Sequence, residues 1–392
     1  MFYTNKKNKL KMKKIPYGKQ FIDKKDIASV LEALKKDIIT TGSTVEKFEN
    51  ALGDYFNVKY VSVCNSGTSA LFLSMLAIGL KKDDEIIMPA MNFVASYNIA
   101  KHLGAKIFLA DVDKQTGQMR PVDVLDCCKK FKLTKVKAII LMYNGGYPEN
   151  AQNFKNLKKK LKCMIIEDAC HALGAEYRAN KKNYRIGCCN HVDISTFSLH
   201  PLKTITTGEG GVITTNSKNI NQKIKEFRSL GIVKNKKKHW EYNVLCKGFN
   251  LRLNDFQCAL GLSQLKKIKL FISQRKKIAL KYNKELKKIK NILIPSYTKD
   301  NKPAYHLYLI SLKNFDNKKK DLFLKYMRKK KIILQYHYIP IYKFKLFNEK
   351  YIGRNTEKYY KEAVSLPIHY GLKDKEQTYV INSIKSFFNY KK

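Results

Sequence analysis

The sequence between residues 59 and 216 contains seven short apolar runs. Most of these runs are separated by a segment whose apolar residues have helical spacing. Runs of strand length that alternate with amphipathic segments are typical of strand–helix–strand units, whose strands pair in parallel and whose helices cover both faces of a sheet. The pattern therefore predicts an α/β domain with a largely parallel sheet. The predicted strands are 59–64, 84–90, 105–113, 137–143, 163–169, 191–199 and 210–216.

The sequence pattern changes after about residue 255. Residues 255–289 contain one glycine and no proline, and their apolar residues have the helical period, so we expect one long helix there. Residues 304–312 and 332–340 have the composition of strands. We therefore expect a second, smaller α+β domain, which the long helix connects to the first.

These patterns divide the chain into three parts. The basic start of the sequence lacks the apolar stretch of a signal peptide, and Met12 is an alternative to Met1 as the first residue. We expect a disordered basic leader over 1–14, the large domain over 15–255, and the bridging helix with the small domain over 256–392.

The formal net charge of +45 comes from 77 lysines and arginines against 32 aspartates and glutamates. Only eight of the basic residues are arginines, and the lysines are spread along the whole chain together with many Asn, Ile and Tyr residues. A nucleic-acid site instead concentrates its charge on one element and uses arginine for bidentate contacts. The charge therefore indicates an AT-rich genome, and we expect no nucleic-acid partner. It is still suited to attracting an anionic small substrate.

The apolar runs and the cysteines indicate the cellular compartment. No apolar run reaches the length of about eighteen residues that a membrane-spanning helix needs, so we expect a soluble, cytoplasmic protein without a membrane partner. The nine cysteines include the pairs Cys127–Cys128 and Cys188–Cys189 but no C-x-x-C motif. This spacing fits neither a disulfide framework nor a zinc site. We expect reduced, mostly buried thiols and no metal.

Polar residues follow several of the predicted strands, and ligands of α/β sheets bind beyond the carboxyl ends of strands. Asn65–Thr68 follow the first strand and begin a helix, whose free N–H groups suit an anion such as a phosphate. Glu167–His171 place acidic residues where the fifth strand ends. Taken singly, such residues are equally typical of a turn, a helix cap, a solvated carboxylate or a core histidine.

Lys203 lies in the segment FSLHPLKTITTGEGG, residues 197–211, after a predicted strand and a proline turn. A lysine held at a strand end inside a cleft is desolvated, which lowers its pKa toward nucleophilic use, including condensation with an aldehyde. A phosphate cradle, an acidic residue and a lysine are the anchor, the partner of the ring nitrogen and the covalent tether that pyridoxal 5'-phosphate needs. Together they predict an enzyme that uses this cofactor.

Four segments carry a family resemblance: NSGTSALFLS, IIEDACHALGAEY, DISTFSLHPLKTITTGEGGVITTN and GFNLRLNDFQCALGLSQL. In order and spacing they resemble the DegT/StrS family of pyridoxal-phosphate-dependent nucleotide-sugar aminotransferases, and the match runs from about Ile15 to the end of the sequence. The resemblance implies the fold type I architecture of aspartate aminotransferase, and a homodimer with shared active sites.

The resemblance also implies roles for individual residues around the cofactor. Lys203 would bond covalently to the cofactor and then move the proton between the carbons of cofactor and substrate. Asp168 would pair with the pyridine nitrogen, His171 would lie beside the phenolic oxygen, and Phe93 would stack on the ring. The residues expected to hold the phosphate are Gly67, Thr68, Ser198 and, from the other subunit, Asn250.

Further segments resemble the branch of this family that acts in pseudaminic acid biosynthesis, namely IPYGKQFIDKKDIASVL with TTG after it, FSLHPLKTITTGEGG, and YHYIPIY. This branch implies that a UDP-linked 4-keto sugar receives an amino group from L-glutamate. The residues expected to line the sugar-nucleotide site are Tyr17, Thr40, Gln335, His337 and Tyr338.

Several alternatives stay open at this point. The protein could aminate another nucleotide sugar, at C3 or on a GDP- or dTDP-linked substrate, or be a regulatory nucleic-acid-binding protein on the same scaffold. Sugar dehydratases of the same fold have histidine in place of the lysine, and Lys203 argues against that activity. The loop LMYNGGYPEN departs from the family pattern at Tyr143 and Asn144, so its contacts are in doubt. Arg252 is a candidate for binding the donor carboxylate.

Overall fold

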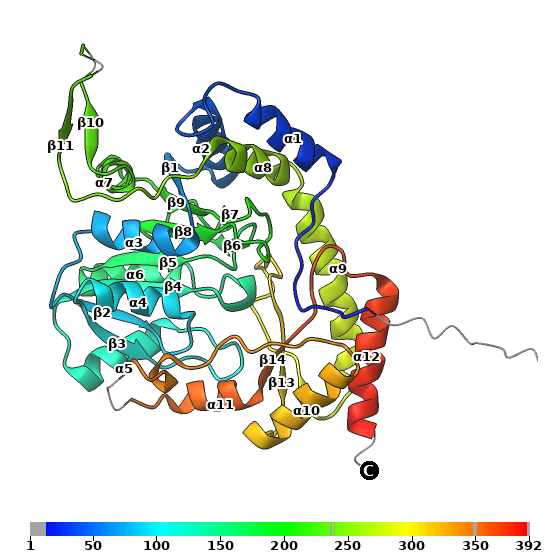
Figure 1. The fold of residues 1–392 in the computed structure, drawn as a ribbon. Coiled ribbons are helices and arrows are strands. Elements are labelled where there is room, and N and C mark those ends of the chain that lie inside the picture. Colours follow the sequence, from blue (N-terminus) through cyan, green and yellow to red (C-terminus); the bar gives the residue numbers. More distant parts are fainter. Residues whose placement is uncertain (1–12, 236, 239, 348–350, 390–392) are drawn as a thin grey trace, which may run out of the picture.

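The computed structural model describes residues 13–235, 237–238, 240–347 and 351–389 (Figure 1). The basic leader expected over 1–14 therefore lies outside the described residues except for its last two positions, and so does Met12. Over the described part of the chain, none of the helices has the length and apolar character that crossing a bilayer requires.

A seven-stranded sheet forms the centre of the larger part of the molecule, with the strand order β1-β9-β8-β5-β4-β2-β3 (Figure 1). All neighbouring strands are parallel except that β9 runs antiparallel to both β1 and β8. Each predicted apolar run supplies one strand, which confirms the predicted α/β fold with a largely parallel sheet. The strands are β1 (Tyr60–Cys64), β2 (Glu85–Pro89), β3 (Lys106–Ala110), β4 (Val136–Met142), β5 (Met164–Asp168), β8 (Ile194–Ser198) and β9 (Gly211–Thr215).

Helices cover both faces of this sheet, because successive side chains of a strand point to opposite faces. Ile166 packs in one core with α3, α4 and α7, whereas the adjacent Ile165 packs in another core with α5 and α6. The helices of the first face are α3 (Gly67–Ala77), α4 (Val94–His102) and α7 (Lys218–Arg228), and those of the second are α5 (Pro121–Phe131) and α6 (Asn153–Leu161).

The long helix expected over 255–289 is broken, and the prediction of one continuous helix is wrong. Helix α8 (Asp255–Leu265) packs against α1 (Lys24–Leu34) and α2 (Ser43–Phe56), and α9 (Ile268–Leu286) continues in a new direction. At the break, Lys267 leaves the helical conformation, and its ammonium group lies 2.6 Å from the fully buried carboxylate of Asp26. A buried carboxylate needs such a partner, so this tertiary contact favours the break.

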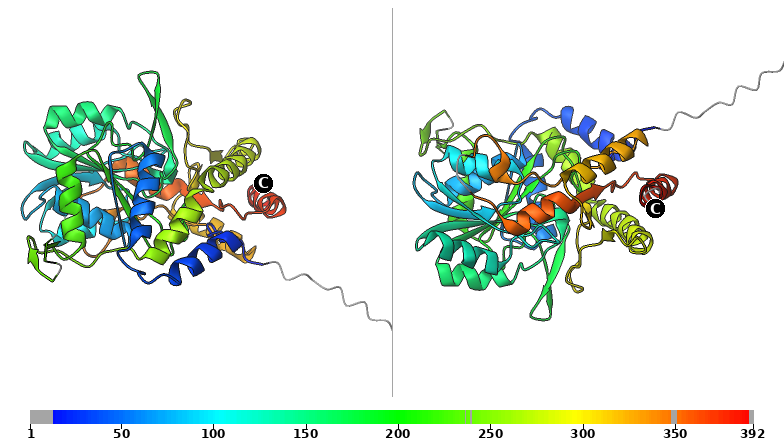
Figure 2. Two further views of the ribbon diagram at one scale, coloured as in Figure 1. Left: turned by 90° about the horizontal axis from the view of Figure 1, so that it is seen from above. Right: turned by 90° about the horizontal axis from the view of Figure 1, so that it is seen from below.

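A second, three-stranded antiparallel sheet lies toward the C-terminus, in the order β12-β13-β14. It consists of β12 (Ile292–Leu293), β13 (Tyr308–Leu312) and β14 (Ala363–Leu366), and it shares a hydrophobic core with α9, α10 (Asn317–Lys329) and α12 (Asp374–Asn389). Both views of Figure 2 show α9 and α12 side by side at the end of the molecule away from the cyan strands of the large sheet.

The strand expected over 332–340 does not form, so that prediction is wrong. This segment makes isolated bridges from Ile332 to Ile15 and from Gln335 to Ser365. It then crosses to the large sheet, where the N–H group of Ile341 donates to the carbonyl oxygen of Ala90 at 3.0 Å. Its backbone is therefore held by contacts to separate parts of the molecule rather than by a neighbouring strand.

Two hairpins, two 3-10 turns and one further helix complete the described chain. The hairpin β10–β11 projects from the rest of the molecule (Figure 1). The remaining elements are β6 (Glu176–Ala179), β7 (Lys182–Arg185), β10 (Ile232–Lys234), β11 (Tyr242–Val244), the 3-10 turns η1 (Asn144–Gly146) and η2 (Ile341–Lys343), and α11 (Arg354–Glu362).

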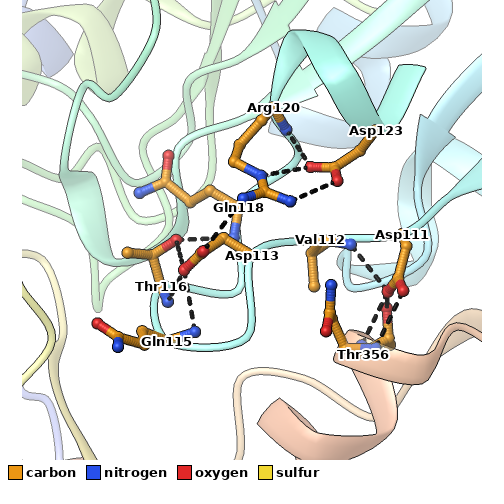
Figure 3. A network of polar contacts seen from close by, with 10 residues as sticks. Asp111, Val112, Asp113, Gln115, Thr116, Gln118, Arg120, Asp123 and Thr356 are labelled. Carbon is orange, nitrogen blue, oxygen red and sulfur yellow. Dashed lines mark hydrogen bonds and ion pairs between the residues drawn. The ribbon is translucent and has the colours of Figure 1, made fainter. Parts of the chain in front are cut away.

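Asp111, directly after β3, caps the start of α11, which is distant in sequence (Figure 3). The residue before α11 is Gly353, which has no side chain to offer to the free N–H groups of the first turn. Asp111 supplies that acceptor, because its carboxylate receives the N–H groups of Asn355 at 3.0 Å and of Thr356 at 2.8 Å. The Thr356 hydroxyl donates to the same carboxylate at 2.7 Å. This cap fastens the C-terminal part of the chain to the large sheet.

Candidate active site

A cavity of about 360 Å³ opens where β5 and β8 end and α3 begins. It brings together most of the residues that the sequence predicts for cofactor and substrate. Those that line it are Tyr17, Gly67, Thr68, Phe93, Asp168, His171, Ser198, Lys203, His337 and Tyr338. The position agrees with the rule that ligands of α/β sheets bind beyond the carboxyl ends of strands.

Lys203 follows β8 through a tight turn, in which its N–H group donates to the carbonyl oxygen of His200 at 2.9 Å. Burial lowers the pKa of its amine below the ordinary value, and the neighbouring Cys170 thiol and Asp168 carboxylate oppose that shift. A lysine with a lowered pKa has more of the neutral amine that attacks a carbonyl carbon. Lys203 therefore has the environment of a nucleophile.

Asp168, the last residue of β5, is almost completely buried. Burial raises the pKa of its carboxyl group, while hydrogen bonds from Cys170 and Ser96 and the charge of Lys203 lower it. The contacts are the Cys170 N–H at 3.2 Å and the Ser96 hydroxyl at 3.4 Å. A buried carboxylate with so few short hydrogen bonds is suited to a cationic partner in the cavity.

The N-terminus of α3 forms another wall of the cavity. Ser66 caps this helix by accepting the N–H group of Ser69 at 3.0 Å, while the N–H groups of Gly67 and Thr68 begin the first turn, where no helical partner is available. A Cβ atom on Gly67 would lie 2.7 Å from Cβ of Ser198, so only glycine allows this approach. The site therefore suits an anion that accepts backbone N–H groups and a serine hydroxyl.

His171 is held at both ring nitrogens. The N–H group of Gly145 donates to its Nδ1 at 3.3 Å, and its Nε2 lies 2.7 Å from the hydroxyl of Tyr338. Burial holds the pKa of His171 well below its usual range, and the charges of Lys203 and His337 add to that shift. The imidazole is therefore neutral at neutral pH, with one donor and one acceptor nitrogen.

The sequence matches the DegT/DnrJ/EryC1/StrS aminotransferase family over residues 20–385. The chain belongs to this family. The match includes both sheets and every cavity residue named above except Tyr17. The nucleotide-sugar aminotransferase expected from the sequence is thereby confirmed at the level of the family.

Curated relatives of this DegT-family chain share about a third of its residues over almost their full length. A UDP-4-amino-4,6-dideoxy-N-acetyl-beta-L-altrosamine transaminase of Campylobacter jejuni is 37% identical over 95% of this chain and 97% of the relative. A GDP-perosamine synthase of Escherichia coli O157:H7 is 30% identical over 96% of this chain and 100% of the relative. These two relatives act on sugars linked to different nucleotides, so family membership alone does not select the substrate.

Solved structures of aminotransferases share the fold. A Helicobacter pylori aminotransferase involved in the biosynthesis of pseudoaminic acid matches with a TM-score of 0.88 at 31% identity, over 96% of this chain and 100% of that chain. A sugar aminotransferase of Streptococcus pneumoniae, solved in its PLP form, matches with a TM-score of 0.87 at 23% identity, over 96% and 99%. The predicted aminotransferase fold is therefore confirmed.

The cavity of this DegT-family chain fits pyridoxal phosphate, the cofactor that the family implies. The N-terminus of α3 offers donors for the phosphate, Asp168 offers a buried negative charge for the ring nitrogen, and Lys203 offers an amine for the aldehyde. The tight contact between Gly67 and Ser198 leaves the helix N-terminus open to an anion, which is the feature that a phosphate requires.

Three predicted residues of the DegT pattern do not line the cavity of their own chain. Thr40, Asn250 and Gln335 are exposed, and each makes an isolated backbone bridge elsewhere. Asn250 was expected to act in the other subunit, so its place outside this cavity agrees with that expectation without testing it. Arg252 also lies outside the set of residues that line the cavity.

The structure adds cavity residues to which the sequence assigned no individual role. His306 precedes β13 and packs on His171, with ring centroids 4.4 Å apart, and its buried Nδ1 has no hydrogen-bond partner within the described chain. The sequence predicts a strand over 304–312 that includes His306, whereas β13 begins at Tyr308, so the sequence offered no signal for this residue. The other added residues are Ser66, Leu71, Ala95, Met142, Cys170, His200, Leu202 and Glu209.

The loop that departs from the DegT pattern turns its first side chain away from the cavity. The hydroxyl of Tyr143 donates to the carboxylate of Glu167 at 2.6 Å, and Asn144 donates to the Tyr359 hydroxyl at 2.7 Å. Gly146 has φ 86°, and a Cβ atom there would lie 2.3 Å from the carbonyl oxygen of His171. The segment thus contacts the site through Met142, which lines the cavity, and through backbone close to His171, and not through Tyr143.

Proposed function

We propose that this protein transfers the amino group of L-glutamate to the C4 keto carbon of a UDP-linked 2-acetamido-2,6-dideoxy-hexos-4-ulose. The observation that carries the proposal is the meeting of Lys203, Asp168 and the N-terminus of α3 around one cavity. The Campylobacter relative described above supports the UDP-linked substrate, as do the branch motifs of the sequence.

Each part of the chain has a defined task in this proposal. Pyridoxal phosphate, when bound, supplies an aldehyde that condenses with amines and a ring that withdraws electrons from the substrate carbon. Lys203 holds the cofactor covalently at Nζ and then, as a free amine, moves a proton. Asp168 keeps a proton on the ring nitrogen by its charge. Contacts to the distant nucleotide position the keto carbon, and such remote binding energy supports the reaction.

We propose further that two copies of the chain share their active sites. Phe93 lines the cavity yet is 51% exposed, so the cavity is open beside it. Exposed apolar side chains occur on α1, at Ile27 and Leu31, and on β11, at Val244. A second copy that covers these surfaces would bury them and would bring exposed polar residues such as Asn250 to the cavity of its partner.

Lys203 provides the direct test of this function. Purified protein incubated with pyridoxal phosphate should turn yellow, and borohydride reduction followed by peptide mass spectrometry should find the adduct on Lys203. Lys203→Ala should remove the adduct and at least about a thousandfold of the activity, because the covalent tether and proton carrier are both lost. Lys182→Ala, at an exposed lysine of β7, is the matched control and should behave as wild type. Normal turnover by Lys203→Ala would refute the proposal.

The GDP-perosamine synthase relative supports the second candidate, amination of a GDP-linked sugar. A panel of UDP-, GDP- and dTDP-linked keto sugars with L-glutamate, followed by mass spectrometry of the products, separates the two candidates. If the UDP-linked 4-keto sugar is aminated with the highest kcat/KM, the result supports the UDP-linked substrate. A higher kcat/KM for a GDP-linked sugar supports the second candidate.

A further inference from the structure

The proton of His171 can be placed from the contacts of its two ring nitrogens. A backbone N–H group always donates, so the bond from Gly145 requires a lone pair on Nδ1. The single proton of the neutral imidazole therefore lies on Nε2. The Gly145–Gly146 turn is thus the element that selects the tautomer of His171.

The Tyr338 hydroxyl oxygen accepts a hydrogen bond from the N–H group at Nε2 of His171. Nε2 of His171 lies 2.7 Å from the hydroxyl oxygen, and Nε2 is the donor in the tautomer that Gly145 selects. The oxygen of Tyr338 is then an acceptor toward His171, so its own hydrogen must point elsewhere. Within the described chain, no other side chain or carbonyl group is in hydrogen-bond contact with this hydroxyl, and Tyr338 lines the cavity.

The surrounding structure fixes this arrangement. The Asn144 side chain donates to the Tyr359 hydroxyl at 2.7 Å, and that hydroxyl donates to the carbonyl oxygen of His337 at 3.3 Å. Tyr359 therefore joins the turn that selects the tautomer to the segment that carries Tyr338. It belongs to α11, the helix that Asp111 caps.

We propose that Tyr338 is a hydrogen-bond donor to a negatively polarised oxygen of the ligand in the cavity, aligned by Gly145 and His171. The inference rests on the proposed function for the identity of that oxygen. Two ligand oxygens have the required chemistry, namely the keto oxygen of the sugar and the phenolic oxygen of the cofactor ring. A donor at either oxygen stabilises negative charge there, and such a donor is worth most where water is excluded.

Tyr338→Phe tests the proposal by removing the hydroxyl and keeping the ring. Tyr336→Phe is the matched control, because Tyr336 lies on the same segment but its hydroxyl donates to Asp321 outside the cavity. If the keto oxygen is the acceptor, the half-reaction with the UDP-linked keto sugar slows about ten- to a hundredfold in Tyr338→Phe, while the half-reaction with L-glutamate and the absorption spectrum of the bound cofactor are unchanged. If the phenolic oxygen is the acceptor, the spectrum and its pH titration shift. Wild-type spectra and wild-type rates of both half-reactions in Tyr338→Phe would overturn the proposal.

The tautomer of His171 is a separate readout that requires no turnover. With ¹⁵N-labelled histidine in the wild-type holoenzyme, the His171 signals should show an unprotonated Nδ1 and a protonated Nε2, assigned by their loss in His171→Asn. A protonated Nδ1 would overturn the alignment of Tyr338. If the UDP-linked sugar is not a substrate of the wild-type enzyme, the proposed function fails on its own. The nuclear magnetic resonance measurement then still tests the alignment of Tyr338, and the half-reaction with the sugar that the panel identifies as substrate replaces the UDP-linked one in the comparison of Tyr338→Phe with wild type.

Discussion

Glu167 and Asp168 are neighbours at the end of β5, yet their carboxylates lie on opposite faces of the sheet. Asp168 lines the cavity, whereas Glu167 accepts hydrogen bonds from the hydroxyl groups of Tyr143 and Ser195 in the interior. Successive strand residues alternate in this way, so a pair of adjacent acids has two separate environments. One acid is available to a ligand, and the other is a structural group.

Glu167 is expected to make stability depend on pH. Burial raises its pKa to about 7, from an ordinary value of 4.5. Because the folded pKa is raised, the associated stability is fully present below about pH 4.5 and is lost as the pH rises through about 7. In the wild-type protein, ionisation of Glu167 should lower the free energy of unfolding by up to about 3 kcal/mol between about pH 5 and pH 8.5. Glu167→Gln should remove this part of the pH dependence, because glutamine does not ionise. Urea denaturation at both pH values measures the change, and an unchanged pH dependence would contradict it. Glu32→Gln, at an exposed ion pair, is the control.

Asp168→Asn should lower the pKa of Lys203 further. The negative charge of Asp168 raises that pKa against the effect of burial, so its removal leaves burial less opposed. The rate at which the cofactor-free protein is acylated at Lys203, followed by mass spectrometry over a range of pH, should show a midpoint at lower pH than in wild type. A midpoint that stays constant or rises would show that the two groups are not coupled. The same variant should lose about a hundredfold or more of kcat, since the ring nitrogen loses its anionic partner.

Gly67→Ala should weaken cofactor binding. The new Cβ would lie 2.7 Å from Cβ of Ser198, so the N-terminus of α3 must move away from the position that suits a phosphate. We expect the Kd for pyridoxal phosphate to rise at least about tenfold. Gly53→Ala in α2, whose Cβ would meet the carbonyl oxygen of Val58 at 3.6 Å, should leave binding unchanged. Absorbance titration of the cofactor-free protein compares the two, and equal affinities would exclude the predicted clash.

Asp111→Ala should destabilise the attachment of α11. It removes the acceptor of the Asn355 and Thr356 N–H groups and of the Thr356 hydroxyl (Figure 3). We expect the free energy of unfolding to fall by about 2 kcal/mol, as for the loss of a good helix cap with additional hydrogen bonds. Denaturant unfolding measures it, and a change as small as that of the exposed Glu32→Gln control would argue against a capping role.

Trp240 is the only tryptophan of the sequence, and it provides a reporter for the proposed dimer. It is 66% exposed on the projecting hairpin, which also carries the exposed Val244. If a second copy covers the hairpin, the emission maximum should shift to shorter wavelength as the protein is concentrated, in step with the mass from light scattering. Val244→Asp should move both transitions to higher concentration. A monomeric mass at all concentrations would rule the dimer out.

One physical reason explains why the large sheet and the cavity can both be predicted from the sequence. The strands are buried on both faces, so their apolar runs are continuous and short, and the chemistry-bearing residues follow them directly. The amino-acid pattern therefore sufficed to bring Glu167–His171 at the end of β5 and Lys203 after β8 to one region of the sheet, and the family resemblance selected Asp168 among them.

Features that depend on distant contacts could not be predicted in this way. At the helix break Lys267 contacts Asp26, far away in sequence, and the segment 332–340 is held by contacts to separate parts of the chain. His306 lines the cavity from the segment that precedes β13, with no periodic pattern to mark it. The division of the chain at residue 255 stays a prediction.

The walls of the cavity come from almost the whole length of the chain, from Tyr17 to Tyr338. A nascent polypeptide cannot enclose Lys203 until the last of these residues has been synthesised. Because burial is what lowers the pKa of this amine, Lys203 acquires its reactive environment only after segments from both sides of it in the sequence have folded together.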